Sequence, residues 1–260
     1  MPDKSVERKP AAPAEKVASG AKRSNFQVSE AYKMIRTNLL FALSTTNSRT
    51  VIFSSAEPGA GKSTLSGNLA IVMAQTGSRV ALVDADMRKP SQHRNFKIPR
   101  TMGLSKILSG LNTLDECICR DVKPNLDVIP AGTIPPNPSE LLGSARMLSL
   151  LEELQEKYDY VFVDMPPLCV VADALVVAPN VAGVVLVSRH KQTTYDELND
   201  AIENVKLSNA NLLGVVLTCV VQEAFGYGRY GRYSRYGRYD RNRYYRTYGY
   251  TYGENEKSDD

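Results

Sequence analysis

The sequence predicts an α/β fold with a doubly wound, mostly parallel sheet. Short runs that are apolar throughout recur along the chain, and segments with helical periodicity separate several of them. The length of 260 residues suits one such domain with short appendages. Hydrophobic residues make up 43% and charged residues 23%, which excludes a wholly disordered chain, a collagen-like repeat and a disulfide-dense mini-protein.

The N-terminal region divides into a leader and a helix. Residues 1–25 mix Lys, Ala, Pro and Ser without periodicity, and Pro10 and Pro13 would interrupt a helix, so we expect a flexible leader. A helix is predicted to begin at Ser29, because apolar residues then recur every three to four positions. These residues are Tyr32, Ile35, Leu39, Leu40 and Leu43. The main domain is predicted to cover residues 26–225.

The remaining elements follow from apolar runs and helical periods. Buried strands are predicted at residues 50–54, 79–83, 126–129, 160–163, 183–187 and 213–217. Helices are predicted at residues 61–75, 145–157 and 195–207. Because strands alternate with helices over most of this order, both faces of the sheet should be covered.

The C-terminal segment 226–260 has an unusual composition. It holds ten of the 14 tyrosines, and residues 226–250 carry seven Arg against one Asp, a net charge of +6. It has almost no aliphatic side chain to bury, so packing cannot offset the entropy lost on ordering. We therefore predict a disordered, tyrosine-rich tail.

Targeting and cysteine signals are weak. The longest apolar runs are far shorter than the ~18 residues that cross a bilayer, and the first 22 residues are too polar for a secretion signal, which predicts a cytoplasmic protein. The four cysteines include no C-x-x-C pair, so we expect free thiols without a catalytic role.

A phosphate-binding loop follows the first predicted strand. Residues 56–64 read A-E-P-G-A-G-K-S-T, between that strand and a helix, which is the context of a P-loop. Glycines let backbone N–H groups surround phosphate oxygens, a lysine supplies a cation, and a serine hydroxyl can bind Mg²⁺. The predicted nucleotide-binding residues are Pro58, Gly59, Ala60, Gly61, Lys62, Ser63 and Thr64.

Carboxylates end two of the predicted strands. Asp84 and Asp86 follow one strand, and Asp164 follows another. Ligands of open α/β sheets bind at the carboxyl ends of the strands, so these acids should face the P-loop. The Ser63 hydroxyl and these three acids therefore predict a Mg²⁺-nucleotide site, in which Asp164 can hold the ion directly or through water.

Together these motifs resemble the bacterial protein-tyrosine kinases, or BY-kinases. The similarity is to the separate cytoplasmic kinase subunits of capsular and exopolysaccharide biosynthesis, the CpsD/CapB family. It covers nearly the whole chain and is carried by several motifs and the tyrosine cluster. The motifs are E-P-G-A-G-K-S-T (57–64, Walker A), L-V-D-A-D-M-R (82–88, Walker A′), V-F-V-D-M-P-P (161–167, Walker B) and P-P-N-P-S-E-L-L (135–142). The resemblance implies a P-loop NTPase of the deviant Walker, MinD-like type.

The resemblance also implies roles for single residues. It implies transfer of the ATP γ-phosphoryl group to tail tyrosines of a neighbouring subunit, with Mg²⁺ as cofactor. Lys62 is then the phosphate lysine and Thr64 a phosphate contact. Asp84 is implied to accept the tyrosine proton, with Ser63 as the direct Mg²⁺ ligand and Asp86 and Asp164 holding metal-bound water. Spacing alone leaves open which of Asp84 and Asp86 is the base. The implied phosphoacceptors are Tyr227, Tyr230, Tyr233, Tyr236, Tyr239, Tyr244, Tyr245, Tyr248, Tyr250 and Tyr252.

Three positions depart from the family pattern. Met165 stands where a small hydroxyl residue is common, and Thr218 stands where an asparagine often contacts the base. The E-x-x-R-x-x-R motif that joins subunits into a ring is represented by Glu30, Lys33 and Arg36, in which Lys33 lacks the two-pronged donor of arginine.

The implied partners are other copies of the chain in a ring, the cytoplasmic segment of a membrane adaptor (the polysaccharide co-polymerase) and a phosphotyrosine phosphatase. The adaptor would hold the kinase at the inner face of the membrane, where it would regulate polysaccharide polymerisation and export. We expect phosphorylation to reverse the charge of the tail, to release it from an acidic active-site rim and to loosen the oligomer.

Two other functions fit part of the sequence. Arg, Tyr and Gly in the tail could bind nucleic acid through phosphate contacts and base stacking. The sequence favours this function less than the kinase function. A partition or positioning ATPase of the ParA/MinD type would share the sheet. Those ATPases have a signature lysine at the second P-loop position, where this chain has Glu57, and they lack a tyrosine array.

Overall fold

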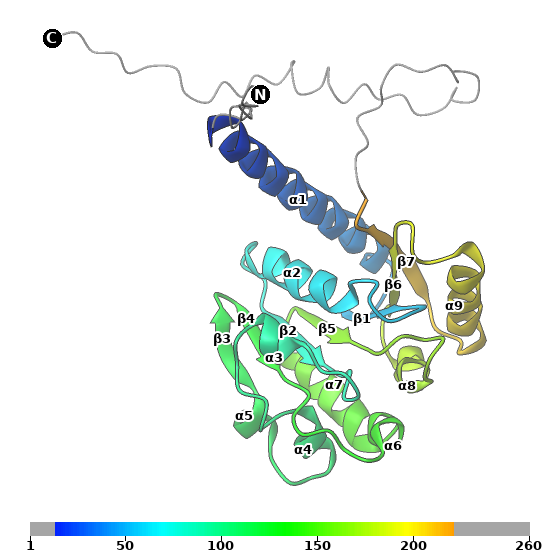
Figure 1. Cartoon of the computed structure of the whole chain (residues 1–260). Coiled ribbons are helices and arrows are strands. Elements are labelled where there is room, and N and C mark those ends of the chain that lie inside the picture. The colour runs from blue at the N-terminus through cyan, green and yellow to red at the C-terminus, as the bar shows by residue number, and fades with distance from the viewer. Residues whose placement is uncertain (1–13, 221–260) are drawn as a thin grey trace, which may run out of the picture. The chain divides into compact units, whose positions relative to one another are not determined.

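The computed structural model describes residues 14–220, and a single seven-stranded sheet organises them (Figure 1). The strands are β1 (Thr50–Ser55), β2 (Val80–Asp84), β3 (Cys119–Lys123), β4 (Leu126–Ile129), β5 (Tyr160–Asp164), β6 (Gly183–Arg189) and β7 (Leu212–Thr218). The longer helices are α1 (Ala14–Leu43), α2 (Lys62–Ala74), α7 (Ala145–Lys157) and α9 (Tyr195–Leu207). The shorter helices are α3 (Gln92–Asn95), α4 (Leu104–Leu108), α5 (Leu114–Cys117), α6 (Pro138–Leu142), α8 (Asp173–Val177) and the 3₁₀ helix η1 (Ala178–Asn180).

The strand order is β3-β4-β2-β5-β1-β6-β7. Every neighbouring pair is parallel except β3 with β4. The carboxyl ends of β1, β2 and β5 therefore lie at one edge of the sheet, and Asp84 pairs in register with Asp164. The predicted doubly wound, mostly parallel sheet is confirmed.

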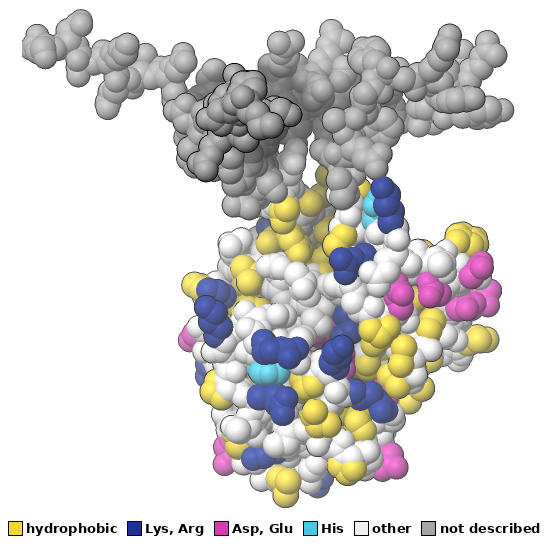
Figure 2. Space-filling model, viewed as in Figure 1, with side chains coloured by type: hydrophobic (Ala, Val, Ile, Leu, Met, Phe, Trp, Pro, Cys, Tyr) yellow, Lys and Arg dark blue, Asp and Glu magenta, His cyan; other side chains and the backbone are white. Residues whose placement is uncertain are grey.

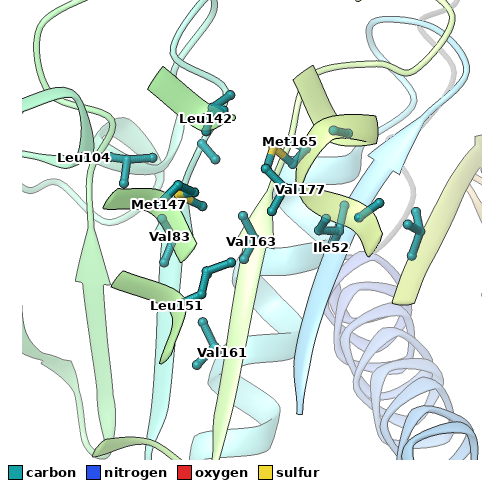
Figure 3. Close-up of a cluster of buried hydrophobic side chains, with 14 of the residues drawn as sticks. Ile52, Val83, Leu104, Leu142, Met147, Leu151, Val161, Val163, Met165 and Val177 are labelled. Carbon is teal, nitrogen blue, oxygen red and sulfur yellow. The ribbon is translucent and has the colours of Figure 1, made fainter. Parts of the chain in front are cut away.

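Two apolar cores lie on opposite faces of the sheet. One core packs α4, α6, α7, α8 and α9 against alternate residues of the central strands, including Ile52, Val83 and Val163 (Figure 3). The other packs α1 and α2 against the intervening residues, such as Phe53, Leu82 and Phe162. Both faces are covered, which is why these strands are apolar without alternation.

The six predicted strands and three of the predicted helices are present, with ends within two residues of the expected positions. Strand β3 was not predicted. Its sequence C-R-D-V-K is charged and largely exposed, because it is an antiparallel edge strand of which only Val122 packs against a core. A strand of this kind lacks the apolar run that predicts its neighbours.

The N-terminal boundary needs a correction. Helix α1 begins at Ala14, not at Ser29, so residues 14–25 are helical instead of part of a flexible leader. Pro13 directly precedes the helix, and proline is tolerated at the start of a helix although it breaks the interior. No proline follows before residue 43, so nothing stops the helix from extending toward its N-terminus. Residues 1–13 lie outside the described part of the chain.

No helix within residues 14–220 is long and apolar enough to span a membrane. The predicted tail, residues 226–260, and the boundary at residue 225 also lie outside the described residues.

Candidate active site

The P-loop connects β1 to α2 and needs glycine at two positions. Gly59 and Gly61 have φ of +85° and +94°, in the left-handed region that side chains disfavour. Gly61 is the N-cap of α2, so the free N–H groups of the first helical turn face the loop. The residues predicted to bind phosphate are therefore together in one loop and helix start.

Two side chains at the ends of β6 and β7 hold the P-loop backbone. The Thr218 hydroxyl, at the end of β7, donates to the Ala60 carbonyl over 2.7 Å. Arg189, at the end of β6, donates to the Gly59 carbonyl over 3.0 Å. Thr218 thus contacts the loop, and its hydroxyl is committed to protein backbone.

Lys62 lies among the predicted acids. Its Nζ is 2.8 Å from Asp86 Oδ2, 3.5 Å from Asp164 Oδ1 and 3.3 Å from Ser63 Oγ. Burial alone would lower the pKa of Lys62, but Asp164 and Asp86 outweigh burial and raise it. Lys62 is therefore a buried ammonium group that stays charged and contacts two carboxylates.

Asp84 and Asp86 differ in what their oxygens contact. Asp86 Oδ2 accepts from Lys62, and its Oδ1 accepts from the Lys89 N–H at 2.9 Å. Asp84 Oδ2 accepts from the backbone N–H groups of Ser91 and Gln92, whereas its buried Oδ1 has no hydrogen-bond partner among the described residues. Burial, followed by the nearby Asp164 charge, raises the pKa of Asp84 to about 7.

Asp164 is fully buried at the end of β5. Its Oδ1 is the oxygen turned to Lys62, and its Oδ2 accepts from Gln92 Nε2 over 2.8 Å. Burial raises the pKa of Asp164, while Lys62, Ser63 and Gln92 oppose the rise. The register of β2 and β5 places this carboxylate beside Asp84.

The donor set fits Mg²⁺ held jointly with a nucleotide. Ser63, Asp86 and Asp164 supply only oxygen atoms, which is the ligand type Mg²⁺ prefers. Within residues 14–220, no group of three or more His, Cys, Asp or Glu side chains could hold a metal ion by itself. A Mg²⁺ ion at this site would therefore take its other ligands from phosphate oxygens and water.

Sequence reasoning missed two contributors to the site. Gln92 is fully buried and contacts both Asp164 and the start of α2. Asp173 on α8 is fully buried and pairs with Arg88 of the Walker A′ motif. Nothing in the sequence predicts either contact. Gln92 lies outside the apolar runs, and Asp173, which interrupts the apolar run 168–178, becomes a neighbour of Arg88 only through the fold.

Met165, one of the departures, is fully buried in the core shown in Figure 3 and fills space beside Val177. A hydroxyl residue there would leave part of that core unfilled. The position therefore contributes packing in this chain.

The prediction of an acidic rim around the active site is wrong on the side formed by the Walker A′ segment. The segment after Asp86 exposes basic side chains, namely Arg88, Lys89, Arg94, Lys97 and Arg100. Acidic side chains gather over α9 instead, where Asp196, Glu197, Asp200 and Glu203 lie (Figure 2). The loop after β2 turns back over α2 and brings the basic segment with it.

The predicted ring motif lies on α1. Lys33 Nζ contacts Glu30 Oε1 at 2.7 Å within the helix. Arg36 donates to the Val72 carbonyl at the end of α2 over 3.4 Å. These residues contact their own chain here, and their role between subunits stays a prediction.

Comparison with known proteins identifies the family. The AAA domain family matches residues 48–213. The tyrosine-protein kinase YwqD of Bacillus subtilis (strain 168) is 40% identical over 189 residues, which are 73% of this chain and 80% of that protein. The chain belongs to the bacterial tyrosine-protein kinases. EpsB of Ralstonia solanacearum is 41% identical over 222 residues, but the chain spans only 29% of that longer protein.

Solved structures of this kinase family have the same fold. The kinase domain of the Escherichia coli tyrosine kinase ETK has a TM-score of 0.73 at 37% identity and covers 78% of this chain and 80% of its own. The cell division ATPase MinD of Pyrococcus furiosus has a TM-score of 0.57 at 20% identity, covering 65% of this chain and 71% of its own, so it shares the fold alone. The predicted MinD-like type of P-loop fold is confirmed.

Proposed function

We propose that this chain is an ATP- and Mg²⁺-dependent protein-tyrosine kinase that phosphorylates tyrosines of the 226–260 segment in a neighbouring subunit. The observation that carries the proposal is the cluster of Lys62, Asp86 and Asp164 at the P-loop, with Asp84 beside it. A P-loop whose lysine lies among buried strand-end acids suits phosphoryl transfer, because the acids can bind Mg²⁺ and accept the proton of a hydroxyl. The ten tail tyrosines supply that hydroxyl within the same protein.

The proposed reaction is an in-line displacement. The tyrosine oxygen forms a bond to the γ-phosphorus of ATP, the bond from that phosphorus to the β-γ bridging oxygen breaks, and ADP leaves. Asp84 is the better candidate for proton acceptor, because its Oδ1 has no hydrogen-bond partner within residues 14–220, whereas both oxygens of Asp86 accept hydrogen bonds. Lys62 would turn from the acids to the phosphates when ATP binds. Ser63, Asp86 and Asp164 would hold Mg²⁺, which would supply further neutralising charge.

We also propose the wider setting that the family suggests. The kinase would act in capsular or exopolysaccharide biosynthesis and regulate polymerisation and export. A membrane adaptor would hold it at the inner face of the membrane, a phosphatase would oppose it, and a ring would form through Glu30, Lys33 and Arg36. The first roughly 25 residues of the tail, fully extended, would reach about 80 Å, enough to enter an adjacent subunit.

Phosphate mapping by mass spectrometry tests the proposal. The wild type, Lys62→Met and a truncation after Phe225 are incubated with Mg²⁺ and ATP, with Lys97→Met as a control at an exposed lysine. We expect tail phosphotyrosine in the wild type and Lys97→Met, and a loss of at least about 10²-fold in Lys62→Met. Phosphate on the Lys62→Met tail after mixing with the truncated wild type would establish transfer between subunits.

The same samples separate the alternatives. ATP-dependent dimerisation without phosphotyrosine would favour a partition or positioning ATPase. Salt-dependent RNA binding by the tail, without phosphotyrosine, would favour the nucleic-acid role. One observation argues against a partition or positioning ATPase. The Glu57 carboxylate accepts a hydrogen bond from the Thr193 hydroxyl at 3.0 Å, so the position of the signature lysine is occupied by an acid that binds a side chain of its own chain.

A further inference from the structure

Gln92 is the side chain that contacts most parts of the site. It is fully buried at the start of α3. Its Nε2 donates to Asp164 Oδ2 at 2.8 Å and to the Ser63 carbonyl at 3.0 Å, and it lies 3.2 Å from Ser66 Oγ. Its backbone N–H donates to Asp84 Oδ2 at 2.9 Å. One residue therefore joins the P-loop helix to both strand-end acids.

The helix beside Gln92 leaves room for it. Gly67 lies in the interior of α2, where glycine costs about 1 kcal/mol relative to alanine. A Cβ at Gly67 would lie 3.2 Å from Gln92 Oε1 and 3.3 Å from a ring carbon of Phe96. The glycine lets the amide approach the helix, so the position of Gln92 is fixed by packing as well as by hydrogen bonds.

The contacts divide the oxygens of Asp164 between two tasks. Gln92 binds Oδ2 with a neutral donor, and Oδ1 is left facing Lys62. A neutral amide satisfies the buried carboxylate without neutralising its charge, which remains available to a cation. Outer hydrogen bonds of this kind orient a metal-binding carboxylate and increase its affinity for the metal.

We infer that Gln92 is a positioning residue for Mg²⁺, which aims the Asp164 carboxylate at the site of the metal and holds it at a fixed distance from α2. The inference rests on the proposed Mg²⁺-nucleotide function. Gln92 touches neither nucleotide nor substrate in this role. It acts through Asp164, and its removal should weaken Mg²⁺ binding while the P-loop still binds nucleotide.

The test measures binding without catalysis. Fluorescent methylanthraniloyl-ADP is bound to full-length wild type, Gln92→Met, Gln92→Leu and Asn95→Ala, first in EDTA and then with increasing Mg²⁺. Asn95→Ala is the matched control, because it removes the bond from Asn95 Nδ2 to Gln92 Oε1 and leaves the amide donor in place. We expect the Mg²⁺ concentration for half-saturation to rise about 10- to 100-fold in both Gln92 variants and to change less than threefold in the control.

The outcomes separate the inference from the proposed function. If the wild type binds no nucleotide or shows no response to Mg²⁺, the proposed function fails. If the wild type responds and a folded Gln92 variant has the same Mg²⁺ half-saturation, the inference is overturned. Equal loss of affinity in EDTA also overturns it, since Gln92 would then support the P-loop alone. If both Gln92 variants lose their cooperative melting transition, the Gln92 amide is needed for folding itself, and its assignment as a positioning residue for Mg²⁺ fails.

Discussion

Arg88 and Asp173, 85 positions apart, form a two-pronged ion pair at the edge of the site. Arg88 Nε and one terminal nitrogen donate to the two Asp173 oxygens at 2.8 and 3.0 Å. The same guanidinium donates to Ser139 Oγ at 2.9 Å, and the Ser139 hydroxyl also bonds to Asp173. The contact ties the Walker A′ turn to α6 and α8, so the loop that carries Asp86 is anchored from outside the nucleotide site.

The first prediction concerns this anchor. Asp173 is fully buried whereas the Arg88 side chain is 42% exposed, so Asp173→Asn should lower the free energy of unfolding by about 2 kcal/mol at pH 7. Urea unfolding measures the change. Exposed Asp196→Asn is the control.

The difference in unfolding free energy between the wild type and Asp173→Asn should become smaller as the pH falls. Burial opposes ionisation of Asp173, but hydrogen bonds from Arg88 and Ser139 prevail and hold its pKa below the ordinary 3.8. The ionised form therefore stabilises the fold above about pH 4, and the contribution is lost as the pH falls through the folded-state pKa. A wild-type advantage equally large at pH 7 and at pH 3 would contradict the prediction.

The sequence predicts the parts of this molecule that have a periodic or spaced signal. Apolar runs identify the central strands, and the spacing of Lys62, Asp84 and Asp164 from strand ends identifies the site. Gln92 and Asp173 could not be found, because a buried amide or carboxylate is recognisable only by partners distant in sequence. Spacing also leaves the choice between Asp84 and Asp86 open, since both acids follow the same strand, and only their oxygen contacts bear on the proposal of Asp84 as proton acceptor.

A second prediction follows from the hydrogen bond between Thr218 and Ala60. Thr218→Val keeps the shape of the side chain and removes the donor to the P-loop carbonyl. One such bond contributes about 1 kcal/mol, so the dissociation constant for nucleotide should rise about fivefold. Because the hydroxyl contacts the loop, affinity for ATP and GTP should fall by the same factor in a binding titration. Loss of affinity for ATP alone would instead mean that Thr218 reads the base.

Asp84 provides a third prediction, in which stability and activity move in opposite directions. A raised pKa means that the folded state disfavours the ionised carboxylate, so above pH 7 this charge costs stability. In Asp84→Asn the side-chain oxygen can still accept from Ser91 and Gln92, but the charge is gone. In EDTA at pH 8 we expect a gain of about 1 kcal/mol, or about 2–4 °C in Tm, together with loss of phosphotransfer.

The control for this experiment is Asp196→Asn on the exposed surface of α9. The gain in Tm should shrink as the pH is lowered toward 4, where the unfolded chain also begins to bind the proton. A lower Tm for Asp84→Asn at pH 8 would mean that the charge is needed by the fold.

The last prediction concerns Lys62 before nucleotide binds. Its ammonium is the cation between Asp86 and Asp164, and its side chain is only 11% exposed. Lys62→Met leaves both carboxylates buried without that cation, so the free energy of unfolding should fall by about 3–5 kcal/mol. Adding Asp86→Asn to Lys62→Met removes one of the unpaired charges and should recover part of the loss, so the two changes are not additive. Urea unfolding of the two single variants and the double variant measures the coupling. Additive effects would show that Lys62 and Asp86 are not energetically coupled. Binding of ATP would then break no ion pair when Lys62 moves to the phosphates.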